Sequence, residues 1–196
     1  SLTIDPNLNT TYYWGSSSGR IYKSTDSGST WSSIANAGSS SILKILIHPT
    51  DSNIVFACSR YSGLFRSTDG GTSWIQVISG QSYDVEFDPN DTNIVFASGD
   101  KVFRSTDNGV TFTEVTGVGS DVKMIGVTKA DSNRVYVVEA NGSSFGGFYK
   151  STDNGVSFSK LDHGNKNYFG YQSDASDNRG QAPRDMGIAV SPTDAD

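Results

Sequence analysis

The tripeptide Ser-Thr-Asp occurs four times in this chain, and it marks a repeat that runs almost the whole length of the sequence. The copies begin at Ser24, Ser67, Ser105 and Ser151, so they lie 43, 38 and 46 residues apart. Each copy follows an aromatic and a basic residue, and each is followed at fixed spacing by Gly and then by Trp or Phe. The Asp, Gly and aromatic members are Asp26, Gly28 and Trp31; Asp69, Gly71 and Trp74; Asp107, Gly109 and Phe112; and Asp153, Gly155 and Phe158. Self-similarity at this period is typical of solenoids and propellers.

A second motif recurs in phase with the first and indicates the strands of one repeat. Alternating apolar residues lead into a turn at Asp5-Pro6, His48-Pro49, Asp88-Pro89 and Ser191-Pro192, whereas the equivalent Thr128-Lys129 has no proline. In the second repeat, four short strands are predicted and are named A to D in order: Leu43–His48, Asn53–Cys58, Gly63–Ser67 and Ser73–Val77. Four strands in roughly 40–45 residues are the spacing of one propeller blade.

We therefore predict an all-β chain, a β-propeller of four-stranded antiparallel blades. The repeats span about 2–41, 42–81, 82–121 and 122–185, and residues 186–196 repeat strand A of a fifth blade. A strand A without its partner leaves an open sheet edge, so we expect a single domain that is part of a larger propeller. The alternatives are that four blades close a ring or that two copies of the chain assemble one. The expected structural partner is thus the missing blades or a second copy.

The Ser-Thr-Asp-x-Gly box lies between strands C and D, where it is predicted to form a hairpin turn. An Asp side chain accepts hydrogen bonds from nearby backbone N–H groups, and Gly adopts a positive φ without a Cβ clash. The aromatic residue then opens strand D and packs into the blade core. The alternative is that the four carboxylates act as catalysts or metal ligands. Blade geometry disfavours a catalytic or metal-binding role, because the blades place the four carboxylates around the rim of the ring, too far apart to converge.

The boxes resemble the Asp-box, or BNR, repeat, whose pattern is Ser-x-Asp-x-Gly-x-x-Trp. That repeat occurs in sialidases, in family 74 glycoside hydrolases and in sortilin-type receptor domains, all of which are β-propellers. The combined pattern, with its Asp-Pro or His-Pro turn, is most similar to the sortilin-like and family 74 branch. The resemblance implies a secreted or cell-surface protein and a ring of six or more blades. It is specific for the fold and not for an activity, because the motif belongs to the scaffold.

Composition limits the partners and cofactors that the chain can use. Its 21 acidic and 15 basic residues give a net charge of −6, and no segment concentrates Lys and Arg, so we expect no nucleic-acid partner. No apolar run approaches ~18 residues, so no membrane insertion is expected. The one cysteine, Cys58, lies in an apolar run and is predicted to be buried. The sequence has no P-loop, dinucleotide fingerprint or catalytic triad, and we predict no cofactor and no metal.

Long loops on a rigid scaffold tend to carry function, and the longest here is the insertion 160–185. On a propeller it lies on the face opposite the boxes, together with the loop between strands B and C of the second repeat. The expected ligand-binding residues are the tyrosines and arginines of these loops: Tyr168, Tyr171, Arg179, Arg184, Arg60 and Tyr61. The alternative is that the insertion packs over the adjacent blade and its aromatic residues form a small core. Asp174–Asn178 resembles a calcium loop faintly, but its spacing is wrong for an EF-hand.

Strand A lines the channel of a propeller, which places Asp84 and Glu86 on one face, roughly 6–7 Å apart by the rise of a strand. Lys44 occupies the same rung one blade earlier, so the simplest interpretation is a salt bridge in the channel. The functional alternative is glycoside hydrolysis, which uses two carboxyl groups ~5–10 Å apart. The weak catalytic candidates on that interpretation are Asp84, Glu86 and Asp185.

These observations favour a binding or scaffold module that engages glycan or protein ligands through its loop face. The alternative is a xyloglucanase-like or endoglucanase-like glycoside hydrolase, or a fragment of one. A sialidase is disfavoured because the chain lacks the Arg-Ile-Pro signature of those enzymes. We therefore expect that the chain is not an enzyme. If it is an enzyme, we expect a glycoside hydrolase.

Overall fold

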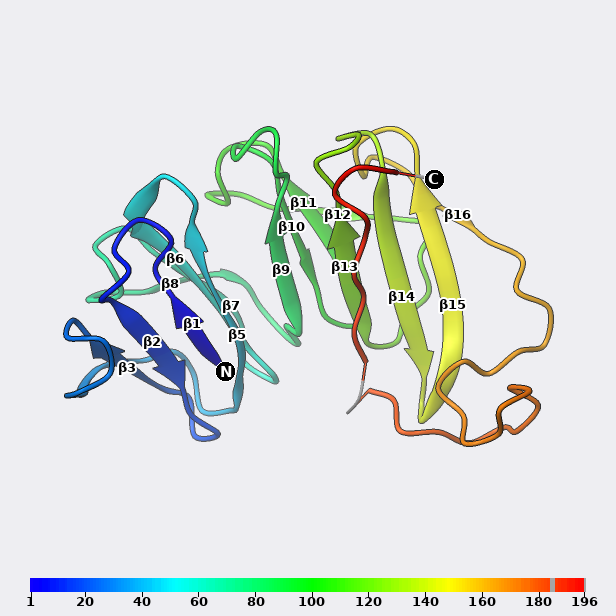
Figure 1. Ribbon diagram of the computed structural model, residues 1–196, viewed down its shortest axis with the longest axis horizontal. Coiled ribbons are helices and arrows are strands. Elements are labelled where there is room, and N and C mark those ends of the chain that lie inside the picture. Colours follow the sequence, from blue (N-terminus) through cyan, green and yellow to red (C-terminus); the bar gives the residue numbers. More distant parts are fainter. Residues whose placement is uncertain (184–185, 196) are drawn as a thin grey trace.

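The computed structural model describes residues 1–183 and 186–195, and it arranges them as four antiparallel sheets that follow one another in an open arc (Figure 1). Blade 1 contains β1 (Leu2–Ile4), β2 (Tyr12–Gly15), β3 (Arg20–Ser24) and β4 (Ser32–Asn36). Blade 2 contains β5 (Ile42–His48), β6 (Asp51–Ser59), β7 (Gly63–Ser67) and β8 (Ile75–Ile78). Blade 3 contains β9 (Asp84–Phe87), β10 (Val95–Ser98), β11 (Val102–Ser105) and β12 (Thr113–Val115). Blade 4 contains β13 (Lys123–Val127), β14 (Val135–Asn141), β15 (Ser144–Ser151) and β16 (Ser159–Lys160).

The predicted blades are confirmed, because each sheet is a meander in which strands pair in chain order. The predicted strands of the second repeat agree with β5 to β8 to within two residues at each end. Strand B of blades 2, 3 and 4 is buried on both faces, as its continuous β-branched and aromatic run predicts. Cys58 on β6 is fully buried, as expected, and burial raises the pKa of its thiol to about 12. A thiol in that state is a packing residue and not a nucleophile.

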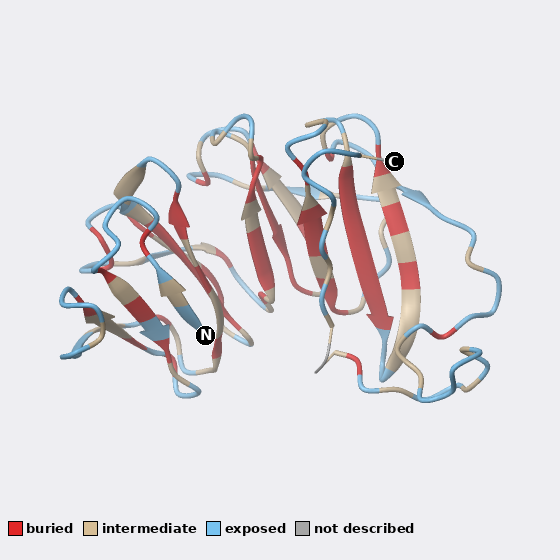
Figure 2. Ribbon diagram, viewed as in Figure 1, coloured by how far each residue is buried: buried red, intermediate tan, exposed pale blue. Residues whose placement is uncertain are grey.

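The hydrophobic cores lie between successive blades (Figure 2). The first core joins Tyr13 and Ile21 of blade 1 to Ile45, Val55 and Ala57 of blade 2, and two similar cores join blades 2 to 3 and 3 to 4. Alternation along each strand therefore directs one set of side chains to the preceding blade and the other set to the following blade. Each blade can bury its apolar faces only against its neighbours.

Each Ser-Thr-Asp-x-Gly box forms the hairpin between the third and fourth strands of its blade. In blade 1, the Ser24 hydroxyl donates to Asp26 Oδ1 over 2.7 Å and accepts the N–H of Gly28 over 2.9 Å. Asp26 Oδ1 also accepts the N–H of Thr30 over 2.8 Å, and Gly28 has φ +86°. The other three boxes repeat these serine, aspartate and glycine bonds. The residues thus close a turn within one blade.

The aromatic residues of the boxes in blades 2, 3 and 4 pack against the preceding blade. Trp74 joins the core between blades 1 and 2, Phe112 the core between blades 2 and 3, and Phe158 the core between blades 3 and 4. The prediction that all four aromatic residues are buried in a blade core was wrong for Trp31, which is 37% exposed. Trp31 instead lies edge-on to Trp14 of its own blade, with their ring centres 6.5 Å apart.

The basic residue before each box has a role that sequence analysis did not foresee. Its side chain donates to the backbone carbonyl of the residue before the box glycine in the next blade. The bonds are Lys23 Nζ to Gly70 O (3.0 Å), Arg66 Nε to Asn108 O (3.0 Å) and Arg104 Nε to Asn154 O (2.8 Å). The same box glycine lies directly under an aromatic ring of the preceding blade: a Cβ on Gly109 would be 2.2 Å from Phe56 Cζ. The boxes of blades 2, 3 and 4 therefore close their own hairpins and also join two blades.

Residues 186–195 differ from the prediction of a fifth strand A. They have no strand assignment, although they run beside β13 (Figure 1). A Cβ added to Gly126 would be 2.7 Å from Val190 and 3.0 Å from Ile188, so both side chains cover this part of β13. In the four blades, strand A is hydrogen-bonded only to its own strand B. The segment therefore packs where strand A would lie without forming a ladder.

The box aspartates predict how stability depends on pH. Hydrogen bonds from neighbouring Ser and Thr groups lower the pKa of Asp26, Asp69, Asp107 and Asp153 to about 2. A folded pKa below the unfolded value, about 3.9, gives stability that is complete above pH ~5 and is lost as the pH falls toward 2. We expect the melting temperature, measured by circular dichroism, to fall through this window. Asp107→Asn should weaken the dependence, and a melting temperature that stays constant down to pH 3 would contradict the assignment.

Candidate functional site

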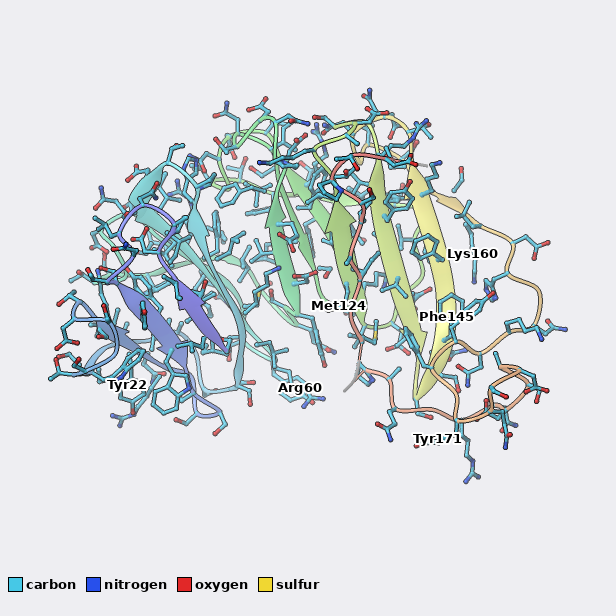
Figure 3. All side chains as sticks on the ribbon, viewed as in Figure 1. Tyr22, Arg60, Met124, Phe145, Lys160 and Tyr171 are labelled. Atoms are coloured by element: carbon cyan, nitrogen blue, oxygen red, sulfur yellow. The ribbon has the colours of Figure 1, made fainter. Side chains whose placement is uncertain are left out.

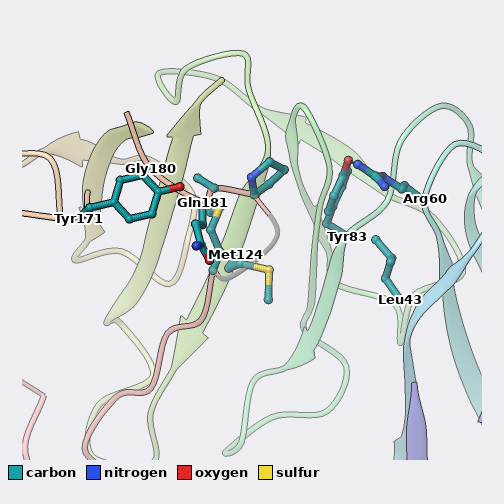
Figure 4. Close-up of a pocket in the computed structure, with 10 residues that line it drawn as sticks. Leu43, Arg60, Tyr83, Met124, Tyr171, Gly180 and Gln181 are labelled. Carbon is teal, nitrogen blue, oxygen red and sulfur yellow. Dashed lines mark hydrogen bonds between the residues drawn. The ribbon is translucent and has the colours of Figure 1, made fainter. Parts of the chain in front are cut away.

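A cavity of about 680 Å³ opens at the mouth of the channel, on the edge of the arc opposite the box hairpins. It lies between the loops of blades 2 and 3 on one side and the insertion of blade 4 on the other (Figure 4). Its lining is Leu43, Arg60, Tyr83, Met124, Tyr171, Gly180, Gln181, Ala182, Pro183 and Met186. The lining combines apolar side chains with polar groups, and among the described residues Arg60 supplies its one formal charge. A cavity of this size that combines the two is typical of a ligand site.

Arg60 is held at the cavity wall by two tyrosines. Its Nε donates to the hydroxyl of Tyr83 over 3.1 Å, and this bond is the main cause of a raised pKa of the guanidinium. The guanidinium carbon lies 5.0 Å from the ring centre of Tyr61 and 5.8 Å from that of Tyr83. Cation–π contacts and the hydrogen bond to Tyr83 thus hold the side chain at the cavity wall.

The insertion is organised around Asn167, which is 7% exposed. Its Oδ1 accepts the N–H of Phe145 on β15 over 2.8 Å, and its Nδ2 donates to the carbonyls of Asp177 and Arg179 over 3.1 and 3.2 Å. A β-bridge between Gly170 and Gly180 brings the two arms of the insertion together. These bonds fix an irregular loop on the end of blade 4.

An aromatic cluster attaches the insertion to blade 4. The ring of Phe145 lies 4.6 Å from His163, 5.0 Å from Tyr168 and 5.5 Å from Phe169, each in an edge-to-face arrangement. The interpretation that this loop packs over the adjacent blade with a small aromatic core of its own is therefore correct for these residues. It also leaves Tyr171, which is 66% exposed and is labelled in Figure 3, at the edge of the cavity drawn in Figure 4.

The structure brings together only some of the predicted ligand-binding residues. Arg60 and Tyr171 both line the cavity, and Tyr168 borders a smaller hollow of about 240 Å³ beside it. Tyr61 is 62% exposed and contacts Arg60 from outside the cavity, and Arg179 is exposed and contributes its backbone carbonyl to Asn167. Arg184 and Asp185 lie outside the described residues.

Sequence analysis missed the residues that form most of the cavity wall. Leu43 and Met124 lie on the channel strands, Tyr83 precedes β9, and Gln181 and Met186 flank the end of the insertion. Only their place in the repeat could have identified them, because Leu43, Tyr83 and Met124 stand at or beside the beginning of strand A in successive repeats. The residues at those positions share no chemical type, so no pattern identified them.

The two channel carboxylates are paired with Lys44, as the structural interpretation expected. Lys44 Nζ lies 2.7 Å from Asp84 Oδ1 and 2.5 Å from Glu86 Oε1. Burial alone would lower the pKa of Lys44, but the two nearby carboxylates outweigh this effect, and the pKa of Lys44 is raised. Burial also raises the pKa of Glu86. The second oxygen of Asp84 accepts the N–H of Ile125 over 2.8 Å, and its side chain is only 2% exposed. Both oxygens of Asp84 are thus engaged in holding blades 2, 3 and 4 together.

A second buried ion pair, which sequence analysis did not predict, stabilises blade 4. Lys123 is completely buried, and its Nζ lies 3.3 Å from Glu139 Oε1 and donates to the carbonyl of Asp100 over 2.8 Å. The hydroxyl of Tyr149 donates to Glu139 Oε2 over 2.7 Å. Burial lowers the pKa of Lys123, and Glu139 opposes this effect. All the polar groups of this cluster have partners, which suits a structural role.

The region around Asp174 does not form an open cation site. Asp174 Oδ1 accepts both the N–H and the hydroxyl of Ser176, and Asp177 Oδ2 accepts the N–H of Tyr171 over 2.6 Å. Within residues 1–183 and 186–195, no group of three or more His, Cys, Asp or Glu side chains is placed to hold a metal ion. The same residues include no helix long and apolar enough to span a bilayer.

Comparison with solved structures identifies the arrangement of the sheets. An ancestral GH74 enzyme superposes with a TM-score of 0.70 at 24% identity, over 82% of this chain and 23% of that one. The GH74 xyloglucanase from Xanthomonas campestris gives 0.66 at 14% identity, over 83% of this chain and 29% of that one. YCF48 bound to D1 peptide gives 0.57 at 13% identity, over 83% of this chain and 52% of that one. The chain is a β-propeller that resembles the GH74 group.

Sequence comparison adds a match to part of the propeller. The family profile for Sortilin-Vps10, described as sortilin, neurotensin receptor 3, matches residues 19–101, which cover the second half of blade 1, all of blade 2 and the first two strands of blade 3. No curated protein matches the chain. The chain spans about a quarter of the two GH74 proteins and about half of YCF48. At these identities, the likeness shows the fold and not an activity.

Proposed function

We propose that this propeller is a binding module that holds a segment of another protein in the cavity at the channel mouth. The observation that carries the proposal is the cavity of about 680 Å³ with Arg60 on one wall and Tyr171 on the other. The ligand would insert an apolar side chain between Leu43, Met124 and Met186. It would present a carboxylate to Arg60.

The chemistry of the lining favours a peptide over a sugar. Methionine side chains are flexible and adapt to the shape of apolar ligand groups. Arginine, held by Tyr83, recognises a carboxylate through paired N–H donors. YCF48, a structural neighbour of this chain, has been solved bound to D1 peptide, which supports a peptide on a propeller of this kind. A cavity for a neutral sugar would instead present several amide and carboxylate groups to its hydroxyls.

A glycan is the second candidate, and one observation favours it. Tyr168 and Tyr171 are 61% and 66% exposed, and both border the smaller hollow beside the cavity. Exposed tyrosine rings can pack against the apolar face of a sugar ring. The Asp-box pattern of the four hairpins and the likeness to the GH74 group support an extracellular or cell-surface location, where either ligand could be met.

Glycoside hydrolysis receives less support from the geometry than binding does. Asp84 is enclosed by Lys44 and by backbone N–H donors, and it is not part of the cavity lining. A catalytic carboxyl group must reach the glycosidic oxygen or the anomeric carbon. If the chain is nevertheless a hydrolase, it should release sugar from xyloglucan, and Asp84→Asn or Asp185→Asn should abolish that release.

An array of immobilised peptides that combine apolar and acidic residues tests the proposal. We expect the chain to bind a subset of them. Arg60→Ala should weaken binding about tenfold or more, since the loss of one charged hydrogen-bond partner costs about 1.5–3 kcal/mol. Tyr171→Ala should weaken it as well, because the opposite wall of the cavity loses its ring. Arg20→Ala is the matched control, because Arg20 is exposed on β3 and lies outside the cavity. Its affinity should equal that of the unaltered chain. Equal affinities for all four proteins, or turnover of xyloglucan without peptide binding, would contradict the proposal.

A further inference from the structure

A cluster of polar side chains joins the turn after β9 in blade 3 to the box hairpin of blade 4. Asp88 Oδ1 accepts the N–H of Asn90 over 2.9 Å and the hydroxyl of Ser132 over 3.2 Å. Asp88 Oδ2 accepts Nδ2 of Asn154, the residue before the box glycine, over 2.8 Å. The same Nδ2 donates to the carbonyl of Ser132 over 2.9 Å, and Asn154 Oδ1 accepts Nη2 of Arg104 over 2.9 Å. The carboxamide of Asn154 thus supplies two donors and one acceptor to this joint.

The joint between blades 1 and 2 has the same frame. Asp5 Oδ1 accepts a backbone N–H over 2.9 Å and the hydroxyl of Ser52 over 3.0 Å, as Asp88 Oδ1 does in its own joint. The N–H of Gly70 donates to the carbonyl of the residue after Ser52 over 3.0 Å, and the N–H of Asn154 makes the equivalent bond over 3.1 Å. Gly70 and Asn154 also share the left-handed backbone conformation, with φ +66° and +57°. Gly70 therefore occupies the position of Asn154 but has no carboxamide.

This difference affects the second oxygen of Asp5. Asp5 is 1% exposed, and its Oδ2 is buried without a hydrogen-bond partner among the described residues. The equivalent oxygen of Asp88 takes its partner from the following blade, and blade 2 follows blade 1 in this chain. A buried polar atom without a partner is costly, and a charged one more so. Asp5 Oδ2 therefore points to a donor other than a side chain.

The polar groups beside Gly70 define what such a donor would meet. The Lys23 ammonium group donates to the Gly70 carbonyl over 3.0 Å, and the Tyr13 hydroxyl donates to the same carbonyl over 2.9 Å. A Cβ on Gly70 would lie 3.2 Å from Lys23 Nζ and 3.7 Å from the carbonyl oxygen of Ser52. Burial raises the pKa of Tyr13, and the charge of Asp5 adds to this effect. Burial lowers the pKa of Lys23, and the charge of Asp5 opposes this effect. An ammonium group, a carbonyl and a carboxylate thus surround one point.

We propose that this point is a binding site for one buried water molecule, which replaces the asparagine carboxamide in the joint between blades 1 and 2. The water would donate to Asp5 Oδ2 and to the carbonyl of Ser52, and it would accept from Lys23 Nζ. These are the two donors and one acceptor that Asn154 supplies in the other joint. A buried water typically makes about three hydrogen bonds to groups that are otherwise unsatisfied. A metal ion would lie beside the ammonium group and an anion beside the carboxylate, so a neutral molecule is favoured.

The water site makes the two joints different in kind. A bound water is not part of the chain, whereas the carboxamide of Asn154 is held covalently in its position. The joint between blades 2 and 3 is not a third case, because His48 stands there in place of the aspartate. The residues around the water site do not line the cavity at the channel mouth, so the inference is independent of the proposed function.

The Gly70→Asn variant of the 196-residue chain tests the energetic side of the proposal. Asn adopts the left-handed conformation more readily than other residues with a side chain, and its carboxamide would displace the water and bond to the same three groups. We expect the melting temperature, measured by circular dichroism, to rise by about 2–4 °C, the shift that one net hydrogen bond gives a chain of this size. Gly164→Asn is the matched control, because Gly164 has φ +61° and an added Cβ would meet nothing within 4 Å. Its melting temperature should match that of the parent chain. A Gly70→Asn variant that is no more stable than this control would contradict the proposal.

A crystal structure of the parent chain, at a resolution that shows ordered waters, tests the site directly. We expect one water within hydrogen-bond distance of Asp5 Oδ2, the Ser52 carbonyl oxygen and Lys23 Nζ. In the Gly70→Asn variant, the new amide nitrogen should stand in its place. Direct contact of Lys23 Nζ with Asp5 Oδ2, no density at this point, or a metal ion there would each overturn the proposal.

Discussion

Glu139→Gln should lower the free energy of unfolding at pH 7 by about 3–5 kcal/mol, which is the usual cost of removing one partner of a buried ion pair. Lys123 is completely buried, and Glu139 is the carboxylate that lies 3.3 Å from its ammonium group. The amide keeps the shape of the side chain, but only its oxygen can accept, whereas Glu139 accepts the N–H of Asp121 at Oε1 and the hydroxyl of Tyr149 at Oε2. The change therefore removes the charge and one of these two acceptors. Urea unfolding followed by circular dichroism would measure the loss.

The pH dependence of that loss identifies its cause. Burial already lowers the pKa of Lys123 from its ordinary value, and without Glu139 the pKa would fall further. A buried lysine whose folded pKa lies below its unfolded value, about 10.4, makes the protein more stable as the pH rises. The difference between Glu139→Gln and the parent chain should thus shrink between pH 7 and pH 10. Lys123→Met added to Glu139→Gln should recover most of the loss at pH 7. A loss that does not vary with pH would show that charge is not the cause.

The fold was predictable from the sequence because the residues that define it act locally and repeat. Asp26 and Gly28 close a hairpin through bonds to Ser24 and Thr30, all within one turn. Four copies of such a turn, each preceded by alternating apolar strands, permit few architectures other than a propeller. The apolar alternation also placed the Lys44–Asp84 contact correctly, since strand A of each blade repeats the same register.

The candidate site was less predictable because its walls come from different repeats. Arg60 and Tyr83 belong to loops of blades 2 and 3, and their bond depends on how the two blades are stacked. The position of Tyr171 depends on Asn167, whose amide bridges Phe145 and the far arm of the insertion. None of these contacts has a sequence period. The buried Lys123 illustrates the same limit, because a lysine at the start of a strand is usually a solvent-exposed residue.

The second large effect is expected at the joint between blades 2 and 3, where Phe56→Ala should cost about 3–5 kcal/mol of unfolding free energy. Phe56 is completely buried on β6 and lies edge-on to Phe87 at 5.7 Å. Its ring also fills the space above Gly109, where no side chain can replace it. Truncation thus leaves a cavity between two sheets that cannot relax independently. Tyr61→Ala is the matched control, because Tyr61 is 62% exposed and should lie within about 0.5 kcal/mol of the parent chain.

The shape of the unfolding curve carries further information about this joint. Blades bury their apolar faces only against their neighbours, so the stability of the arc depends on each of three joints in turn. If the joints are strong, Phe56→Ala should shift a single urea transition and leave its slope unchanged. If the variant weakens one joint below the others, the transition should separate into two, since blades 1–2 and 3–4 would then unfold as different units. A variant as stable as Tyr61→Ala would mean that the polar contacts of Arg66 and Lys44, and not this ring, hold blades 2 and 3 together.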